Sequence, residues 1–368
     1  MAQTKRIQWI DALRGFTMIL VVYSHVHAFG FEGTNSIANN FFFHFRMPLF
    51  FFISGYIAYR ANELWDFHHF KTQMLKKMRI QIIPTLFFGL LFATLVFPFR
   101  YSMTMSESLN LFLNDPAKLG YWFTIALLMM FIIYYTVSFL LSRCKLSTRQ
   151  IVLVAIALLM YMATLACKSI FQYKISHWLC FINVFQYFQF FVFGNIFACY
   201  QKQLFRFLQN PYVIGIIILS FIGLYIANRF LKDSTLINTS LGKTSSKLIL
   251  QIIRYCGILS IVCAFRHYEG LFSTETKIGR GLQYIGKRTL DVYLLHYFLL
   301  PELPTLGRFF SGTFNIVLEV SCTIFVALLV ILFCLIISNF LRTSSFLAYY
   351  LFGAKPEQKQ TKPDTDKH

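Results

Sequence analysis

Residues 7–27 have the sequence IQWIDALRGFTMILVVYSHVH, an apolar stretch of membrane length that still contains Asp11, Arg14 and His25. Ionisable side chains inside a membrane helix are costly and usually persist only where they face a partner or a water-filled cavity. At about 100° per residue, Arg14 and His25 lie within roughly 20° of each other, and Asp11 and His25 within roughly 40°. The stretch therefore predicts one helical stripe bearing an acid, a guanidinium and an imidazole. The last two are separated by roughly 16 Å of helix rise.

The composition is that of a polytopic membrane protein. Hydrophobic residues make up 57% of the 368-residue chain and charged residues 13%, with a mean hydropathy of +0.58, which excludes an ordinary soluble domain. The net charge of +19 comes from Lys and Arg between the apolar runs, which favours positive-inside topology over nucleic-acid binding. The eight cysteines form no C-x-x-C pair, so we expect buried small residues and no metal site.

The apolar runs predict an all-α, multi-pass membrane bundle of about ten transmembrane helices. The predicted spans are 7–29, 41–60, 80–100, 121–141, 150–167, 179–200, 211–230, 246–266, 282–301 and 313–341. With the N-terminus inside, roughly 22 Lys and Arg residues fall on the cytoplasmic side and roughly 9 on the outer side. Both termini are therefore expected to be cytoplasmic, and the protein is expected in the cell's inner (cytoplasmic) membrane.

Residues 1–345 are expected to form a single transmembrane domain. Within it, residues 63–79 carry apolar side chains at helical spacing next to several lysines, which predicts a basic amphipathic helix on the cytoplasmic surface. Residues 346–368 end in a polar, charged stretch, so we expect a disordered cytoplasmic tail.

His25 is the first candidate catalytic residue. A membrane-embedded imidazole near a carboxylate or a guanidinium can act as a general base near neutral pH. The alternative is a structural hydrogen bond between helices, but the stripe shared with Asp11 and Arg14 favours catalysis. For Arg14 two interpretations remain open: contact with an anionic substrate, with Asp11 holding it in place, or a simple i, i+3 pair at the helix end.

Further candidates lie on other predicted spans. Arg60, Lys76 and Arg79 could form a phosphate cradle for a nucleotide-bearing cofactor, although positive-inside topology and lipid headgroup contact explain them as well. Arg46 lies within the aromatic run 45–56. Polar residues of the later spans predict interhelical hydrogen bonds one by one and a polar cavity together.

The motifs along the chain resemble acyltransferase family 3. Residues 10–16 (IDALRGF), followed by Ser24 and His25, resemble the first motif of that family, and residues 45–56 resemble its second-helix signature as found in fucose-4-O-acetylase-like members. Residues 121–123 (YWF) resemble its Trp-Phe element, and residues 290–296 (LDVYLLH) its late Tyr-Leu-x-His motif. The resemblance covers nearly the whole chain, in order.

The resemblance implies transfer of an acyl group, usually acetyl from acetyl-CoA, to a hydroxyl of a cell-envelope carbohydrate. It identifies His25 as the essential histidine and Arg14 as the first-helix arginine; Asp11 completes the predicted catalytic set. The expected acyl-CoA contacts are Arg14, Arg60, Lys76 and Arg79. The expected acceptor contacts are His44, Arg46, Trp122, Arg254 and His296.

The expected partners are acyl-CoA, an envelope glycan or lipid-linked sugar, and the lipid bilayer, without nucleic acid. A transporter or flippase of lipid-linked envelope sugars is the alternative function. Transporters often contain inverted repeats and broken helices, and because the sequence shows no internal repeat, the acyltransferase hypothesis is preferred.

Overall fold

The computed structural model describes residues 7–31, 36–59, 65–166, 174–233, 239–313 and 315–354. Within these ranges the chain is helical and contains no strand. Nine helices of the described residues are long and apolar enough to span a membrane: Gln8–Gly30, Ile37–Ala58, Phe67–Tyr101, Trp122–Leu140, Leu146–Leu165, Phe181–Cys199, Pro211–Lys232, Gly242–His267 and Ile316–Leu341. The predicted all-α, multi-pass membrane bundle is therefore confirmed.

Short helices and two π-helical turns interrupt or connect these spans. The elements are α1 Gln8–His25, η1 Val26–Gly30, α2 Ile37–Phe43, α3 Arg46–Ala58, α4 Phe67–Leu91, η2 Phe92–Val96, α5 Phe97–Tyr101, α6 Met105–Asn114, η3 Lys118–Gly120, α7 Trp122–Leu140, α8 Leu146–Ala166, α9 Lys174–Trp178, α10 Phe181–Cys199, α11 Gln201–Leu208, α12 Pro211–Asp233, α13 Ser240–His267, α14 Lys277–Lys287, α15 Thr289–Leu299, α16 Pro304–Thr313, α17 Ile316–Leu341 and α18 Ser345–Phe352.

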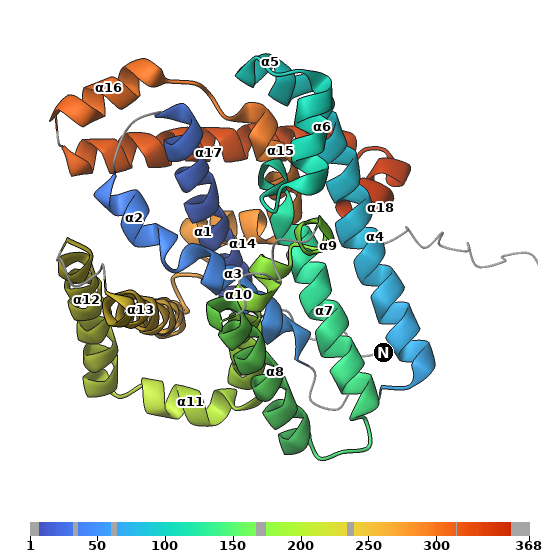
Figure 1. Ribbon diagram of the computed structural model, residues 1–368, viewed down its shortest axis with the longest axis vertical. Coiled ribbons are helices and arrows are strands. Elements are labelled where there is room, and N and C mark those ends of the chain that lie inside the picture. The colour runs from blue at the N-terminus through green and yellow to red at the C-terminus, as the bar shows by residue number, and fades with distance from the viewer. Residues whose placement is uncertain are drawn as a thin grey trace, which may run out of the picture.

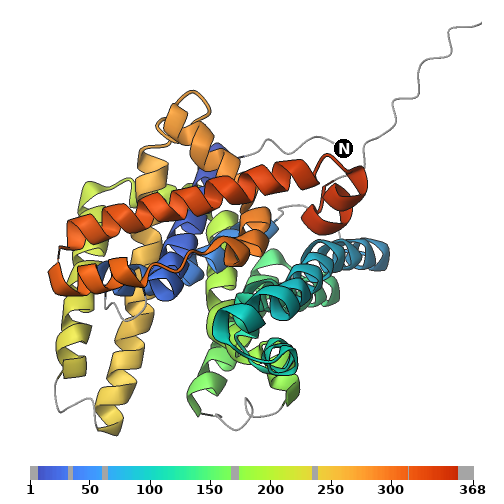
Figure 2. The same cartoon turned by 90° about the horizontal axis from the view of Figure 1, so that it is seen from above.

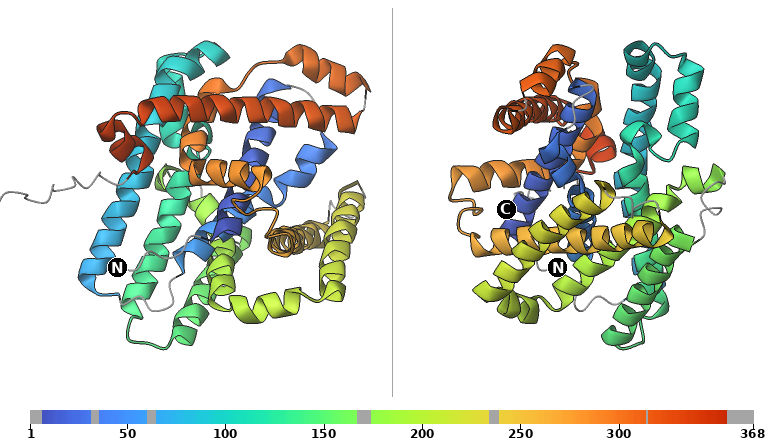
Figure 3. Two further views of the ribbon diagram at one scale, coloured as in Figure 1. Left: turned by 180° about the vertical axis from the view of Figure 1, so that it is seen from behind. Right: turned by 60° about the vertical axis from the view of Figure 1, so that its left-hand side comes forward.

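Helix α1 lies in the middle of the molecule, with α12 and α13 on one side and α4 and α7 on the other (Figure 1). Figure 2 shows α17 running across one face of the bundle. Glycines at two helix contacts let the helices approach very closely. A Cβ at Gly15 would lie 2.0 Å from the Leu282 carbonyl oxygen, which brings α14 against α1 as Figure 3 shows. A Cβ at Gly55 would lie 1.8 Å from the Phe191 carbonyl oxygen, so α3 and α10 are in backbone contact.

The expected ninth span, 282–301, is wrong as a single helix. It consists of two helices of 11 residues, α14 and α15, separated at Arg288, whose φ of −113° and ψ of 19° are not helical. The buried Asp291 explains the break, because Arg288 and Arg342 both pair with its carboxylate, at 3.2 Å and 2.8 Å. The break thus lets charged residues within an apolar stretch neutralise one another.

The expected amphipathic helix 63–79 is not a separate element. Asp66 caps α4 by accepting a hydrogen bond from the His69 backbone N–H at 2.6 Å, and α4 continues without a break into the third span. The first residues of the expected helix, 63 and 64, lie outside the described residues, as does Arg60. The basic segment is therefore the first half of a membrane-spanning helix.

The first residues of the expected disordered tail, 346–368, are helical. Residues Ser345–Phe352 form helix α18, with Ala348, Leu351 and Phe352 buried. Arg79 on α4 holds this helix, because its guanidinium donates to the Tyr349 carbonyl oxygen at 3.1 Å and stacks 3.6 Å from the Tyr349 ring centre. Residues 355–368, the rest of the expected tail, lie outside the described residues.

Candidate functional site

A cavity of about 750 Å³ runs beside α1 and contains both Arg14 and His25 in its wall. It is also lined by residues of α3, α4, α7, α10 and α15. Its size is within the range of ordinary small-molecule sites. Because Arg14 and His25 are eleven residues apart on one helix, the cavity has an Arg14 end and a His25 end separated by roughly 16 Å. The predicted stripe thus becomes one wall of a real cavity.

Hydrogen bonds fix the tautomers of two histidines at the His25 end. His296 Nδ1 lies 3.0 Å from the Val292 carbonyl oxygen, which only accepts, so Nδ1 carries the proton. In the neutral ring His296 Nε2 is then the acceptor, and it lies 2.9 Å from His25 Nδ1. His25 Nδ1 is therefore the donor of that bond. The lone pair of His25 is left on Nε2, 3.3 Å from the Tyr297 hydroxyl.

The backbone around this histidine pair is tightly held. The π-helical turn η1 begins directly after His25, and such turns are frequent at functional sites. Within it, His27 Nε2 lies 3.3 Å from Glu319 Oε1 on α17. Gly120 has φ +100°, and a Cβ there would lie 2.1 Å from the Tyr297 hydroxyl. Only glycine fits this approach of the 115–120 loop to the tyrosine.

Two cations, Arg14 and Lys77, line the cavity in addition to Arg46. Arg14 donates a hydrogen bond to Thr289 Oγ1 at 2.8 Å and lies 3.7 Å from Asp11 Oδ1. Lys77 of α4 also lines the cavity, with its ammonium 3.5 Å from the centre of the Phe131 ring. Asp11 itself is buried at 4% exposure and does not line the cavity. It lies behind Arg14, against α14.

Two of the other expected donor contacts, Lys76 and Arg79, lie off the cavity wall. Lys76 is exposed, and Arg79 is bound to α18 as described above. Arg60 lies outside the described residues. The cation that α4 presents to the cavity is therefore Lys77, one position beyond Lys76 and about 100° around the helix from it.

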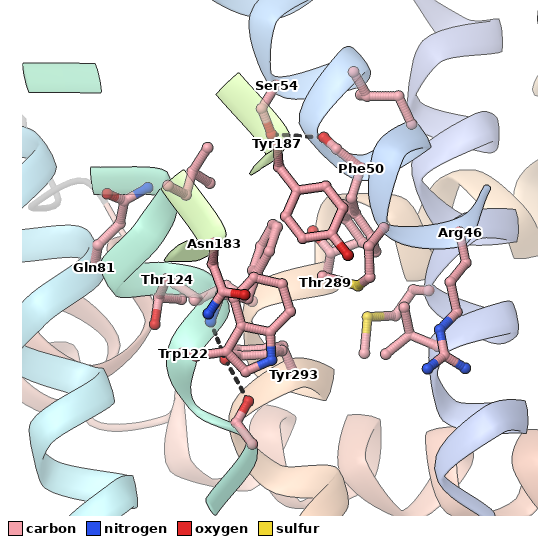
Figure 4. A pocket seen from close by; sticks show the side chains of 18 of the residues that line it. Arg46, Phe50, Ser54, Gln81, Trp122, Thr124, Asn183, Tyr187, Thr289 and Tyr293 are labelled. Carbon is pink, nitrogen blue, oxygen red and sulfur yellow. Dashed lines mark hydrogen bonds between the residues drawn. The ribbon is translucent and has the colours of Figure 1, made fainter. Parts of the chain in front are cut away.

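The expected acceptor contacts gather around the His25 end, on and behind the cavity wall. Arg46 and Trp122 line the cavity directly. Figure 4 shows Trp122 next to Tyr187, whose ring is stacked on it at 5.9 Å and 24°. His296 lies behind His25, and Arg254 lies behind Tyr187, 6.0 Å from its ring centre. His44 is not in the wall and packs against Tyr225 at 5.6 Å.

Sequence reasoning missed several residues of the cavity wall. They are Ser54, Gln81, Tyr187, Thr289, Tyr293 and Tyr297. Lys77 belongs to the basic segment 76–79 and Asn183 to the polar residues of the later spans, and the late motif containing His296 could have drawn attention to Tyr297 beside it. The other side chains carry no signal that separates them from ordinary packing residues in the sequence alone.

Comparison with known proteins gives one match. A family model described as an acyltransferase domain, that of acyltransferase family 3, matches residues 7–339. Neither the curated proteins nor the solved structures contain a match. Among the residues that the structure describes, no group of three or more His, Cys, Asp or Glu side chains is placed to hold a metal ion.

Proposed function

Because the chain belongs to acyltransferase family 3 and is therefore a membrane acyltransferase, we propose that it transfers an acyl group, acetyl in the simplest case, from acyl-CoA to a hydroxyl of a cell-envelope carbohydrate. The observation that carries the proposal is His25. Its Nε2 accepts a hydrogen bond from the Tyr297 hydroxyl at 3.3 Å, and both side chains line a cavity whose wall also contains Arg14 and Lys77.

The donor fits the Arg14 end of the cavity. Acyl-CoA combines several phosphates with a long, uncharged pantetheine arm, and Arg14 and Lys77 supply cations for the phosphates. The wall between the two ends is largely apolar, with Met18, Val21 and Ile53 among its residues, which suits the arm. The positive-inside count places the Arg14 end on the cytoplasmic side, where acyl-CoA is made, with both termini on that side in the inner membrane.

The proposed reaction is a direct transfer in which His25 acts as the base. His25 Nε2 takes the proton of the acceptor hydroxyl while that oxygen attacks the thioester carbonyl carbon. The tetrahedral intermediate then collapses, the carbon–sulfur bond breaks, and the proton passes from His25 to the CoA sulfur. The products are the ester and CoA–SH, and His25 returns to its neutral form.

Neighbouring residues orient the base and stabilise charge. His296 accepts a hydrogen bond from His25 Nδ1–H and so keeps Nε2 unprotonated, as the acceptor of a hydrogen bond from the Tyr297 hydroxyl that the acceptor hydroxyl would replace. Arg46 lines the same cavity, where its positive charge favours negatively charged groups near the reacting atoms. Holding both substrates in a site shielded from water supplies a further large part of the rate.

The direct test is a comparison of envelope glycans by mass spectrometry from cells with the wild-type protein, with His25→Ala and without the protein. We expect acetyl groups on a glycan in wild-type cells and their loss in the other two, since removing a general base lowers rates by about 100- to 10,000-fold.

His68→Ala is the matched control, because His68 lies on the exposed surface of α4. It should leave acetylation unchanged. Membrane content of each variant is measured in the same samples. Normal acetylation by a His25→Ala protein that is present in the membrane at the wild-type level would contradict the proposal.

A further inference from the structure

Two guanidinium groups lie near Tyr187, and neither forms an ion pair with a carboxylate of the described residues. Arg46 lines the cavity, and Figure 4 shows it in the wall with Tyr187. Arg254 is 5% exposed and lies 6.0 Å from the Tyr187 ring centre. The Nε and Nη1 atoms of both arginines are buried and have no hydrogen-bond partner within the described ranges.

The two arginines come from helices in direct contact. A Cβ at Gly257 of α13 would lie 3.1 Å from Cβ of Phe45. Arg46 follows Phe45 in the chain, and Arg254 precedes Gly257 by three residues, nearly one helical turn. Arg46 therefore lies in the cavity wall with Tyr187, and Arg254 lies behind the Tyr187 ring, off the wall.

Tyrosine side chains are among the groups that surround the two arginines. Tyr297 and Tyr187 lie near Arg46, and Tyr187 and Tyr161 lie near Arg254. His44 and His25 lie nearby as further basic groups. The acidic residue in the cavity wall, Asp115, accepts a hydrogen bond from the Ala117 N–H at 2.7 Å within its own loop.

Neither topology nor packing accounts for this charge. Positive-inside topology explains cations at the Arg14 end, but Arg46 lines the His25 end. The contact of Arg46 with the Phe43 ring, at 5.1 Å, is a cation–π interaction, which stabilises a desolvated guanidinium only weakly. A buried guanidinium without an anionic partner is unfavourable, so the two arginines are suited to a partner that carries the opposite charge.

We infer that Arg46 binds an oxyanion of the acceptor and that Arg254, behind Tyr187, adds to the positive charge at this point, so that the acceptor is an anionic carbohydrate bearing a phosphate ester or a carboxylate. Guanidinium groups bind both oxyanions in a bidentate manner. The stacked rings of Trp122 and Tyr187 provide a flat surface for a sugar next to that charge. The inference rests on the proposed function, since it concerns the acceptor of the same reaction.

The test measures binding of three sugars to the full-length protein in lipid nanodiscs, read from tryptophan fluorescence. The probes are glucose 1-phosphate, glucuronate and glucose, and their comparison also shows which oxyanion is preferred. We expect at least one charged sugar to bind roughly 30-fold or more tightly than glucose. Arg254→Gln should reduce that difference while leaving the affinity for acetyl-CoA unchanged.

Two further variants make the result specific. Arg229→Gln removes an exposed arginine of α12 and should keep the preference for the charged sugar. Arg254→Lys keeps the charge without the planar guanidinium, so it should retain an intermediate preference. This variant also gives an answer if Arg254→Gln does not fold.

Equal affinity of the wild type for all three sugars would overturn the inference, as would weaker acetyl-CoA binding with unchanged sugar preference in Arg254→Gln. The second result would assign the two arginines to the donor. Either result leaves the proposed function intact, because glycan acetylation in cells is measured separately. If cells with the wild-type protein show no acetylated glycan, the proposed function and this inference both fail.

Discussion

At the residue scale, the stripe shared by His25 and Arg14 and the pairing of Arg14 with Asp11 could be predicted, whereas the contacts with Thr289 and His296 could not. The stripe follows from helix geometry within one segment, so residue spacing was enough to place both side chains on one face. His296 lies 271 residues from His25, and no local pattern predicts which distant helix approaches α1. That approach depends on backbone contacts such as Gly15 with Leu282, which become visible only in the fold.

The His25–His296 hydrogen bond leads to a prediction about orientation. His296→Ala should lower kcat by about 10- to 100-fold, the loss seen when the partner of a functional histidine is removed. The acyl-CoA KM should stay constant, because His296 lies behind His25 and away from the Arg14 end of the cavity. The measurement is steady-state acetyl transfer over a range of pH.

His296→Gln separates positioning from packing. Its side-chain amide oxygen can accept the His25 Nδ1 proton, so part of the lost rate should return. In all active variants the rate should fall as the pH decreases, because protonated His25 cannot act as a base. If His296→Ala keeps full activity, His296 does not orient the base.

Lys77 is expected to contribute to binding of the acyl donor. Lys77→Gln should raise the KM for acetyl-CoA with little change in kcat, since a phosphate contact holds ground state and transition state alike. Lys76→Gln, which removes the adjacent exposed lysine, is the matched control. An equal rise in KM for both variants would place the phosphates on the outer surface of α4 and not in the cavity.

At the scale of elements, span number and helical character could be predicted more reliably than breaks and boundaries. Hydropathy averages over a run, so the polar residues inside 282–301 did not reveal the break at Arg288. The pairing of Asp291 with Arg342 joins segments 51 residues apart. For the same reason α18 was missed: its apolar residues are stabilised by packing on α4, and no propensity of its own marks it as ordered.

Close helix contact predicts that alanine substitutions at two glycines of α14 differ strongly in their effect on stability. A Cβ at Gly286 would lie 1.8 Å from the Asp11 carbonyl oxygen, whereas one at Gly281 meets nothing within 4 Å. Gly286→Ala should therefore destabilise the protein by about 1–3 kcal/mol through overpacking. Gly281→Ala should be neutral or stabilising by up to about 1 kcal/mol.

The melting temperatures of both variants in the same detergent give the comparison, with acetyl transfer as a second readout. Gly286→Ala should also lower activity, because α14 leads directly into Thr289, which hydrogen-bonds Arg14. Similar melting temperatures for the two variants would show that α1 and α14 are not in backbone contact.

For the whole molecule, the direction of α15 decides how the chain crosses the bilayer. Three contacts pair α15 and the segment after it with α1 and η1 in the same chain order: Thr289 with Arg14, His296 with His25, and the Leu303 N–H with the Gly30 carbonyl oxygen at 2.9 Å. The segment therefore runs parallel to α1. If the broken ninth segment crosses the bilayer, the chain has ten crossings and its termini lie on one side.

Topology reporters test this arrangement. A reporter that folds only in the cytoplasm should be active when fused to either end of the chain, as the positive-inside count also predicts. A fusion in the loop between α2 and α1 should be inactive. Activity at the N-terminus alone would mean that α14 and α15 do not cross the membrane together.

The central claim is that His25 drives acyl transfer at the end of a cavity that binds the donor at its other end. The most direct measurement is the release of free CoA thiol from acetyl-CoA by the purified protein in lipid nanodiscs, with glycan acceptor, for the wild type and for His25→Ala. The account predicts about 100- to 10,000-fold slower release by the variant, with unchanged acetyl-CoA affinity. Equal rates for the two proteins would contradict it.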